Sequence, residues 1–72
     1  MNNILENIAV IIKREYPKKF KTKLEFAAAA DVEETTIRRV LKGEQNLSIK
    51  LLQQICNAID IKLSDLFKEI GY

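Results

Sequence analysis

The segment from Thr22 to Gly43 constrains the fold more than any other part of the chain. It begins with Thr22 and Glu25 at the spacing of a capping box, in which the hydroxyl and the carboxylate each accept a backbone N–H. It ends with Gly43, the residue type that most often follows a helix in the left-handed conformation. Asp31, which tolerates that conformation better than most residues, follows a run of alanines. The pattern predicts two short helices joined by a tight turn, the second with Glu33 as its N-cap.

The second of these helices has one apolar side and one basic, polar side. At about 100° per residue, Ile37, Val40 and Leu41 fall together on one side. The opposite side carries Thr35, Arg39 and Lys42, with Arg38 beside them. The apolar side can dock on a core while the other side offers donors and positive charge, and such a helix fits a DNA major groove. The alternative interpretation is an ordinary solvated helix face.

Three further helices are predicted, at about residues 3–16, 48–59 and 64–70. Asn2 or Asn3 can cap the first, which ends before Pro17 because proline disfavours helix at the preceding residue. Ser48 and Ser64 are the expected N-caps of the other two. We therefore predict an all-α fold with five short helices around one core, in a single domain that spans residues 1–72.

The composition narrows the range of functions. The 72 residues include no His and one Cys, Cys56, so zinc sites and His-based catalysis are excluded, and no internal disulfide can form. Cys56 is expected to fill the core. No nucleophile–base pair, metal set or phosphate loop is visible, so neither an enzyme nor a cofactor is expected. No secretion signal or membrane span is recognisable, which predicts a cytoplasmic protein.

Two basic segments flank an acidic one. Residues 13–23 carry a local charge of +5, residues 24–37 a charge of −4, and residues 38–50 a charge of +3. In the predicted fold both basic segments are expected near the DNA-facing surface. Ordinary solvated surface charge is again the alternative.

An ordered set of residues resembles the helix-turn-helix of the Cro and lambda-repressor type, also called the XRE family. The matching positions within the motif at residues 22–43 are Phe26-Ala27, Ala30-Asp31-Val32, Thr36-Ile37 and Lys42-Gly43. The resemblance continues through Asn46-Leu47-Ser48, Leu51-Leu52, Ile55, Ala58-Ile59-Asp60-Ile61 and Leu63-Ser64-Asp65-Leu66-Phe67. No single position is specific, but the ordered spacing is. The resemblance implies a compact lambda-repressor-like fold with this motif as its second and third helices.

The resemblance also implies which residues meet DNA. The expected base-reading residues are Glu34, Thr35, Thr36 and Arg39. The expected phosphate contacts are Thr22, Lys23, Glu33, Arg38, Lys42, Gln45 and Asn46. Arg39 is the strongest candidate reader, because a guanidinium can bond guanine O6 and N7 together.

One departure from the family concerns Leu41. The family often has a Glu at this position, paired with a basic residue of the first helix. With Leu41 in its place, we expect Arg14 to be free for solvent or phosphate.

The predicted function is sequence-specific binding of double-stranded DNA by a small bacterial or phage-type transcriptional regulator, a repressor. Its expected form is a homodimer on a two-fold operator, with Phe67, Ile70 and Tyr72 at the interface and Val10 as a further candidate. No membrane partner and no small-molecule effector is expected, because no effector domain fits in the remaining residues. The alternative is a protein–protein module or antitoxin-like adaptor with the same fold, which the acidic pair Glu33-Glu34 would suit.

Overall fold

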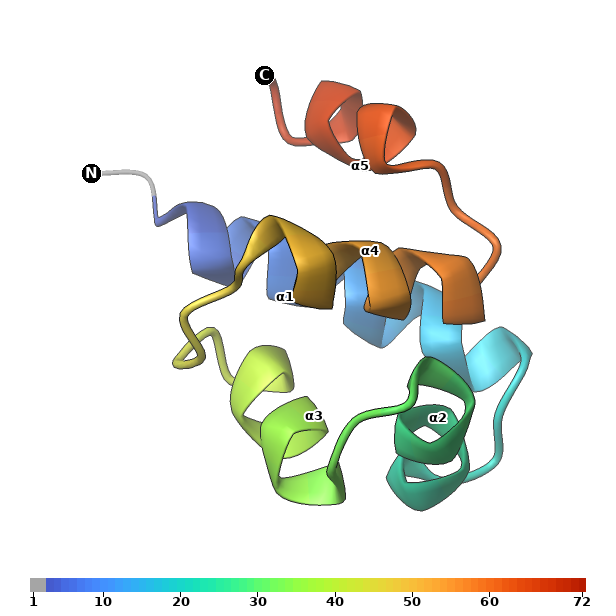
Figure 1. The fold of residues 1–72 in the computed structure, drawn as a ribbon. Helices are drawn as coiled ribbons and strands as arrows, with labels where there is room; N and C mark the ends of the chain where they lie inside the picture. The colour runs from blue at the N-terminus through green and yellow to red at the C-terminus, as the bar shows by residue number, and fades with distance from the viewer. Residues whose placement is uncertain (1–2) are drawn as a thin grey trace.

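The computed structural model describes residues 3–72, which form five α-helices and one short 3-10 helix (Figure 1). In chain order the elements are α1 (Ile4–Glu15), η1 (Tyr16–Lys18), α2 (Lys23–Ala30), α3 (Glu34–Leu41), α4 (Ile49–Ala58) and α5 (Leu63–Glu69). The predicted all-α, five-helix fold is therefore confirmed.

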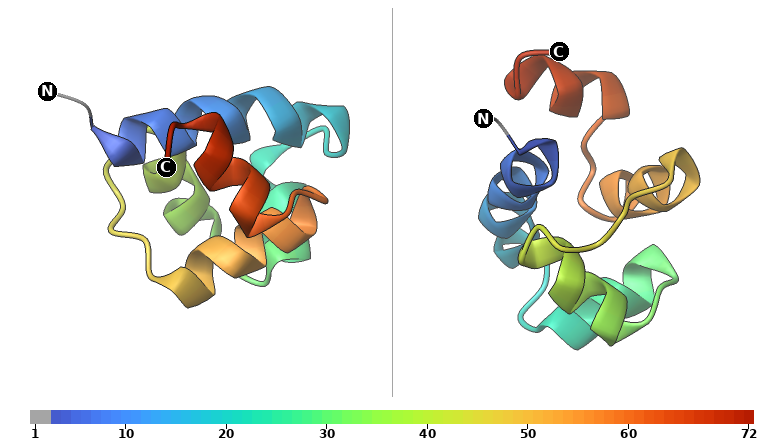
Figure 2. Two further views of the ribbon diagram at one scale, coloured as in Figure 1. Left: turned by 90° about the horizontal axis from the view of Figure 1, so that it is seen from above. Right: turned by 90° about the vertical axis from the view of Figure 1, so that its left-hand side faces the viewer.

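The helix-turn-helix and the last helix lie on opposite sides of the molecule. α3 packs against α1 and α2, α2 also packs against α4, and α5 packs against α4. Both Figure 1 and the right-hand view of Figure 2 place α5 beyond α1 and α4, away from α2 and α3. The side of α3 that faces away from the core is thus not covered by α5.

Side chains cap α1, α2 and α4 as predicted, with Thr22 as the cap of α2. The Asn3 Oδ1 accepts the Leu5 and Glu6 amides at 3.0 and 3.3 Å, while Asn2 lies outside the described residues. The Ser48 hydroxyl accepts the Leu51 amide at 3.0 Å. Each bond satisfies an amide that the first helical turn leaves without a partner, so the caps stabilise the helix starts.

Two aspartates end helices in the same way, and the turn at the first, Asp31, was predicted from the sequence. Asp31 and Asp60 have φ values of 60° and 59°. In both cases the next residue closes the turn: the Val32 amide donates to the Ala27 carbonyl at 3.0 Å, and the equivalent bond after Asp60 is also 3.0 Å long. These bonds form Schellman motifs, which turn the chain sharply: the one at Asp31 lies between α2 and α3, and the one at Asp60 between α4 and α5.

α1 agrees with the predicted helix at about residues 3–16: it ends at Glu15 with Tyr16 as its C-cap, and Pro17 lies within the tighter 3-10 turn η1, where its missing N–H costs little. The predicted N-cap of the last helix was wrong. The last helix begins at Leu63, and its N-cap is Lys62 rather than Ser64. The chain leaves the Asp60 turn in an extended conformation at Lys62 and enters α5 directly, which places Ser64 inside the first helical turn.

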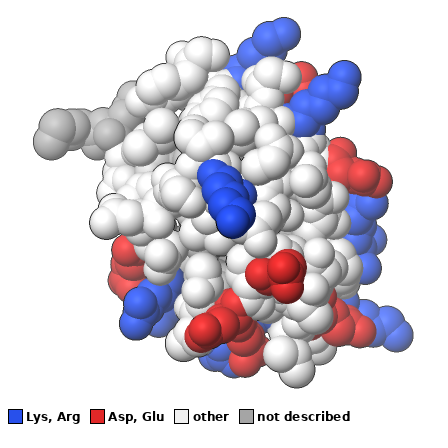
Figure 3. All heavy atoms as spheres, viewed as in Figure 1, with Lys and Arg blue, Asp and Glu red and all other residues white. Residues whose placement is uncertain are grey.

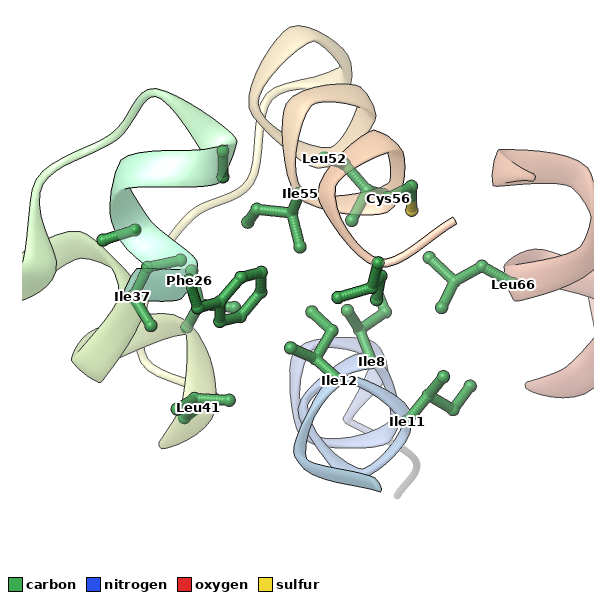
Figure 4. Packing of buried hydrophobic residues seen from close by; sticks show 14 residues of the cluster. Ile8, Ile11, Ile12, Phe26, Ile37, Leu41, Leu52, Ile55, Cys56 and Leu66 are labelled. Carbon is green, nitrogen blue, oxygen red and sulfur yellow. The ribbon is translucent and has the colours of Figure 1, made fainter. Parts of the chain in front are cut away.

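The core is built around Phe26, which is completely buried (Figure 4). Its ring stacks with Tyr16 at 5.1 Å and with Phe20 at 5.6 Å between centroids. The Phe20 contact anchors the connector between α1 and α2. Cys56 is also fully buried, and burial raises the pKa of its thiol to about 11, so the predicted role of core filler is confirmed.

Candidate nucleic-acid interface

The inner side of α3 attaches the helix to the rest of the molecule. Ile37, Val40 and Leu41 are buried, with exposures of 0, 2 and 4 %. Figure 4 shows Ile37 and Leu41 facing Phe26 and the α1 side chains. This burial holds α3 rigidly by hydrophobic contact, so its outer side chains are presented in a fixed orientation.

The outer side of α3 carries exposed polar and basic groups. Thr35, Arg39 and Lys42 are all exposed, as the helical period predicted. Within residues 3–72, neither Arg39 nor Lys42 has a carboxylate within 4.0 Å. Their charges are therefore available to an external anion.

One flank of α3 carries an acidic residue, Glu34, in contrast to the outer side. The Arg38 Nη2 lies 3.3 Å from the Glu34 Oε2, an i,i+4 ion pair on one side of the helix. An exposed pair of this kind is worth roughly 0.3–0.5 kcal/mol and is easily exchanged for another partner. Thr36 is half-buried on the other flank. Glu34 and Thr36 are thus placed less directly outward than Thr35 and Arg39.

The N-terminus of α2 has the geometry of a complete capping box. The Thr22 Oγ1 accepts the Glu25 amide at 3.1 Å, and the Glu25 Oε1 accepts the Thr22 and Lys21 amides at 3.2 and 2.9 Å. Thr22 and Lys23 are exposed. The Lys23 ammonium has no carboxylate within 4.0 Å among the described residues.

The loop after α3 is held against the start of α1. Gly43 has φ 72°, and a Cβ there would lie 3.0 Å from the Glu6 Cγ and 3.1 Å from its Cα. Only glycine fits this close approach. Asn46 is exposed, whereas Gln45 is half-buried and its Nε2 donates to the Asn46 carbonyl at 3.3 Å.

The connection between α2 and α3 carries acidic side chains. Glu33 is the N-cap of α3 and is exposed, but its carboxylate makes no capping hydrogen bond. Figure 3 shows acidic groups gathered low on the face where α2 and α3 lie, with most Lys and Arg at its margins. The start of α3 therefore carries negative charge, which weakens nonspecific attraction to a polyanion such as DNA.

One residue that holds this connection was missed at the sequence level. The Gln54 Nε2 on α4 donates to the Ala30 and Asp31 carbonyls at 3.3 and 3.4 Å. These are carbonyls that the end of α2 leaves without a helical partner. In the sequence, the one indication of this role was the position of Gln54, a polar residue at the edge of the apolar side of α4.

A family model described as the Cro/C1-type HTH DNA-binding domain matches residues 12–70 of the chain. The chain belongs to this family. The resemblance seen in the sequence is thereby confirmed, and family membership supports DNA binding by a regulator. No curated protein and no solved structure matches the chain significantly.

Arg14 is not free in this Cro/C1-type domain, contrary to the expectation. Its Nη1 and Nη2 donate to the Glu69 carboxylate at 2.5 and 3.0 Å, and its Nε donates to Glu15 at 2.8 Å. These hydrogen bonds hold the pKa of Glu69 and of Glu15 below the usual range. Arg14 follows buried Ile11 by three residues and so falls about 60° from it on the helix, and from that edge of α1 it reaches α5 rather than α3.

The expectation for the first basic segment, residues 13–23, was also wrong in part. Lys19 pairs with Asp60 at 2.7 Å, and this contact lowers the pKa of the Asp60 carboxyl. Lys18 pairs with Glu15 at 3.3 Å. These cations are engaged by the protein's own carboxylates rather than gathered beside α3.

The basic residue of α1 that lies near Leu41 is Lys13. A hollow of about 330 Å³ is lined by Lys13, Tyr16, Lys23, Arg38, Leu41 and Lys42. Sequence reasoning chose Arg14 instead of Lys13. The helical period of α1 contained the signal, because Lys13 falls beside the edge formed by Ile12 and Tyr16 while Arg14 falls 100° further round.

No helix within residues 3–72 combines the length and the apolar character that crossing a membrane requires.

Proposed function

We propose that this protein is a sequence-specific regulator of transcription that binds double-stranded DNA with α3 in the major groove. The observation that carries the proposal is the exposed outer side of α3, where Arg39 and Lys42 have no acidic partner within residues 3–72. The buried inner side supports it, since a rigidly held helix loses little freedom on docking. The width of the major groove admits such a helix.

Base reading belongs to the outward residues of α3. Arg39 bonds guanine O6 and N7, which is worth roughly 1–3 kcal/mol of discrimination. Thr35 bonds a base edge or touches a thymine methyl. Glu34 and Thr36 contribute from the flanks, with Glu34 able to accept from the cytosine amino group once Arg38 has moved to phosphate.

Phosphate contacts surround the reading helix and set its register on DNA. The groups proposed for this role are Thr22, Lys23, Glu33, Arg38, Lys42, Gln45 and Asn46. Glu33 contributes through the backbone amides that follow it at the start of α3, since its carboxylate repels phosphate. Binding therefore weakens steeply with salt, because each neutralised phosphate releases counterions.

The regulator is proposed to act as a repressor in the cytoplasm, as a homodimer on a two-fold operator. A repressor can block a promoter simply by occupying it, and a single DNA-binding domain is sufficient for that. Half-sites lie about 34–36 Å apart, one turn of the double helix. Val10 and Tyr72 remain 62 and 70 % exposed, and together with the half-buried Phe67 and Ile70 they are the candidates for the dimer interface. Sedimentation that gives a monomer even on operator DNA would contradict the dimer.

Two substitutions test the assignment of roles. Arg39→Ala is expected to relax the base preference and leave most of the salt dependence, because it removes a base contact. Lys23→Ala is expected to weaken binding to all sequences alike and to reduce the salt slope by about one. The measurement is selection of bound sites from random duplexes, followed by titrations at several salt concentrations. Unchanged operator affinity in both variants would show that this reading face is wrong.

A protein–protein adaptor remains the competing proposal, favoured by the acidic side chains near the α2–α3 connection (Figure 3). The two functions differ in salt dependence. A DNA-binding regulator loses affinity for random duplex DNA steeply between two salt concentrations, whereas an adaptor shows no salt-dependent DNA binding.

A further inference from the structure

We propose that Gln54 of α4 is a positioning residue for base reading, because its side-chain amide fixes the direction in which the first turn of α3 meets DNA. Gln54 lies outside the reading helix and acts through Thr35. The proposal rests on the DNA-binding function above, and it adds a residue outside the helix-turn-helix that determines part of the sequence preference.

The first turn of α3 has little core contact of its own. The buried residues of α3 are Ile37, Val40 and Leu41, and all three lie after that turn. Residues 34–36, which make up the first turn, are exposed or half-buried. The N-cap, Glu33, makes no side-chain hydrogen bond to the helix. The direction of the side chains in the first turn therefore depends on how the chain enters α3.

Gln54 holds the chain at this entry. The end of α2 lies beside α4 (Figure 1). There the Gln54 Nε2 donates to the Ala30 carbonyl at 3.3 Å and to the Asp31 carbonyl at 3.4 Å. Among residues 3–72, no loop or turn amide donates to either carbonyl. The two carbonyls belong to the peptide planes on either side of Asp31, so Gln54 restrains both planes.

The orientation of these two planes sets φ and ψ of Asp31, and with them the angle at which the chain leaves the turn toward α3. Val32 packs on the core at the next position, so the turn stays closed without Gln54 while its angle becomes less restrained. Arg39 belongs to the half of α3 that the core holds. When the bonds from Gln54 are lost, α3 pivots about this buried half, and the displacement is larger at Thr35 than at Arg39.

The test compares Gln54→Met with Gln53→Met, a matched change at the neighbouring glutamine. Gln53 is exposed, and its Nε2 donates to the Asn57 Oδ1 at 2.8 Å rather than to the turn. Operators changed at single base pairs are first assigned to a reading residue, by the loss of discrimination in Thr35→Ala or Arg39→Ala. Gln54→Met is expected to reduce discrimination at the Thr35 base pair by roughly three- to tenfold, the order of one neutral hydrogen bond, and at the Arg39 base pair by less. Gln53→Met is expected to keep both.

Two further substitutions separate the hydrogen bonds from side-chain packing. Gln54→Lys keeps a donor, since an ammonium can bond the last carbonyls of a helix, and is expected to retain the wild-type base preference. Gln54→Glu has a carboxylate that only accepts, so it repels the two carbonyls and is expected to relax the preference at the Thr35 base pair more than Gln54→Met. Thermal unfolding sets a temperature at which every variant is folded. Equal relaxation in the Lys and Glu variants would overturn the role of the donor.

The outcomes distinguish this proposal from the DNA-binding function. A wild-type protein that selects no DNA sequence contradicts the proposed function. Amide NMR signals of the free Gln54→Met protein then test the pivot: larger shifts at Thr35 than at Arg39 support it, and equal shifts overturn it. A wild-type protein that selects a sequence, with Gln54→Met equal to Gln53→Met at the Thr35 base pair, overturns the positioning role alone. An equal loss of discrimination at the Thr35 and Arg39 base pairs also overturns it.

Discussion

Two groups of basic side chains, close in sequence, have opposite surroundings in the structure. Arg14, Lys18 and Lys19 each contact a carboxylate of the protein itself. Lys13 and Lys23, from the same basic segment, line the hollow beside α3, where no lining residue is acidic. We call Arg14, Lys18 and Lys19 the outer cations. The hollow cations are Lys13 and Lys23 together with Arg38 and Lys42 of the α3 region, which line the same hollow.

The comparison shows that the number of basic residues does not determine where a protein attracts an anion. The outer cations hold elements together: Arg14 joins α1 to α5, and Lys19 joins the connector after η1 to the end of α4. Their fields are largely cancelled nearby by the carboxylates. The hollow cations line one depression together with Tyr16 and Leu41, so their fields add there instead of being cancelled one by one.

The largest expected effect comes from neutralising two residues of each group. Lys23→Gln with Lys42→Gln is expected to reduce the salt slope of DNA binding by about two, because two phosphate contacts are lost. Lys18→Gln with Lys19→Gln makes the same change in net charge and is expected to keep the slope. Titrations at matched salt concentrations measure both. Equal slopes for the two double variants would mean that only net charge matters.

The next largest effect tests whether the position of the hollow cations matters as well as their charge. Gly43→Ala leaves every cation in place but puts a Cβ at φ 72° and 3.0 Å from the Glu6 side chain. We expect a loss of about 1–3 kcal/mol in the free energy of unfolding, measured by urea denaturation. DNA affinity should fall as well, since the end of α3 and Lys42 must shift. An unchanged affinity would show that the loop does not position Lys42.

The smallest effect concerns the outer cations and pH. Because Arg14 lowers the pKa of Glu69, the contact stabilises the fold above the ordinary Glu pKa of about 4.3 and is lost as the pH falls through the folded-state pKa. An NMR titration should give Glu69 a pKa below the ordinary value, and Arg14→Gln should return it. Signals of α5 should follow the titration while those of α3 do not. A Glu69 pKa that is equal in both proteins would refute the pairing.

Much of the fold followed from local patterns in the sequence. Thr22 and Glu25 predicted the start of α2, Asp31 predicted the turn, and Gly43 predicted the end of α3, because capping and left-handed residues act within a few positions. The start of α5 did not follow, since Ser64 is as good a local cap as Ser48. The turn at Asp60 and the packing of Ile61 on the core decided where that helix begins.

The candidate site was predictable only along one helix. Thr35, Arg39 and Lys42 were placed correctly on the exposed side of α3, because helical periodicity alone separates the two sides. The basic residue of α1 beside Leu41 was misassigned, although it is only one position away from the chosen Arg14. One residue along a helix changes direction by about 100°, and which direction faces α3 depends on how α1 is packed.

The sequence by itself determined that five helices form, the caps and turns of all but the last, and the apolar side that α3 buries, since these depend on neighbours within four residues. Only the tertiary structure decided which cations are paired and which converge, because Arg14 meets Glu69, and Lys13 meets Lys23 and Lys42, only after distant segments pack together. Electrostatic potential depends on distances in space, and the fold sets those distances.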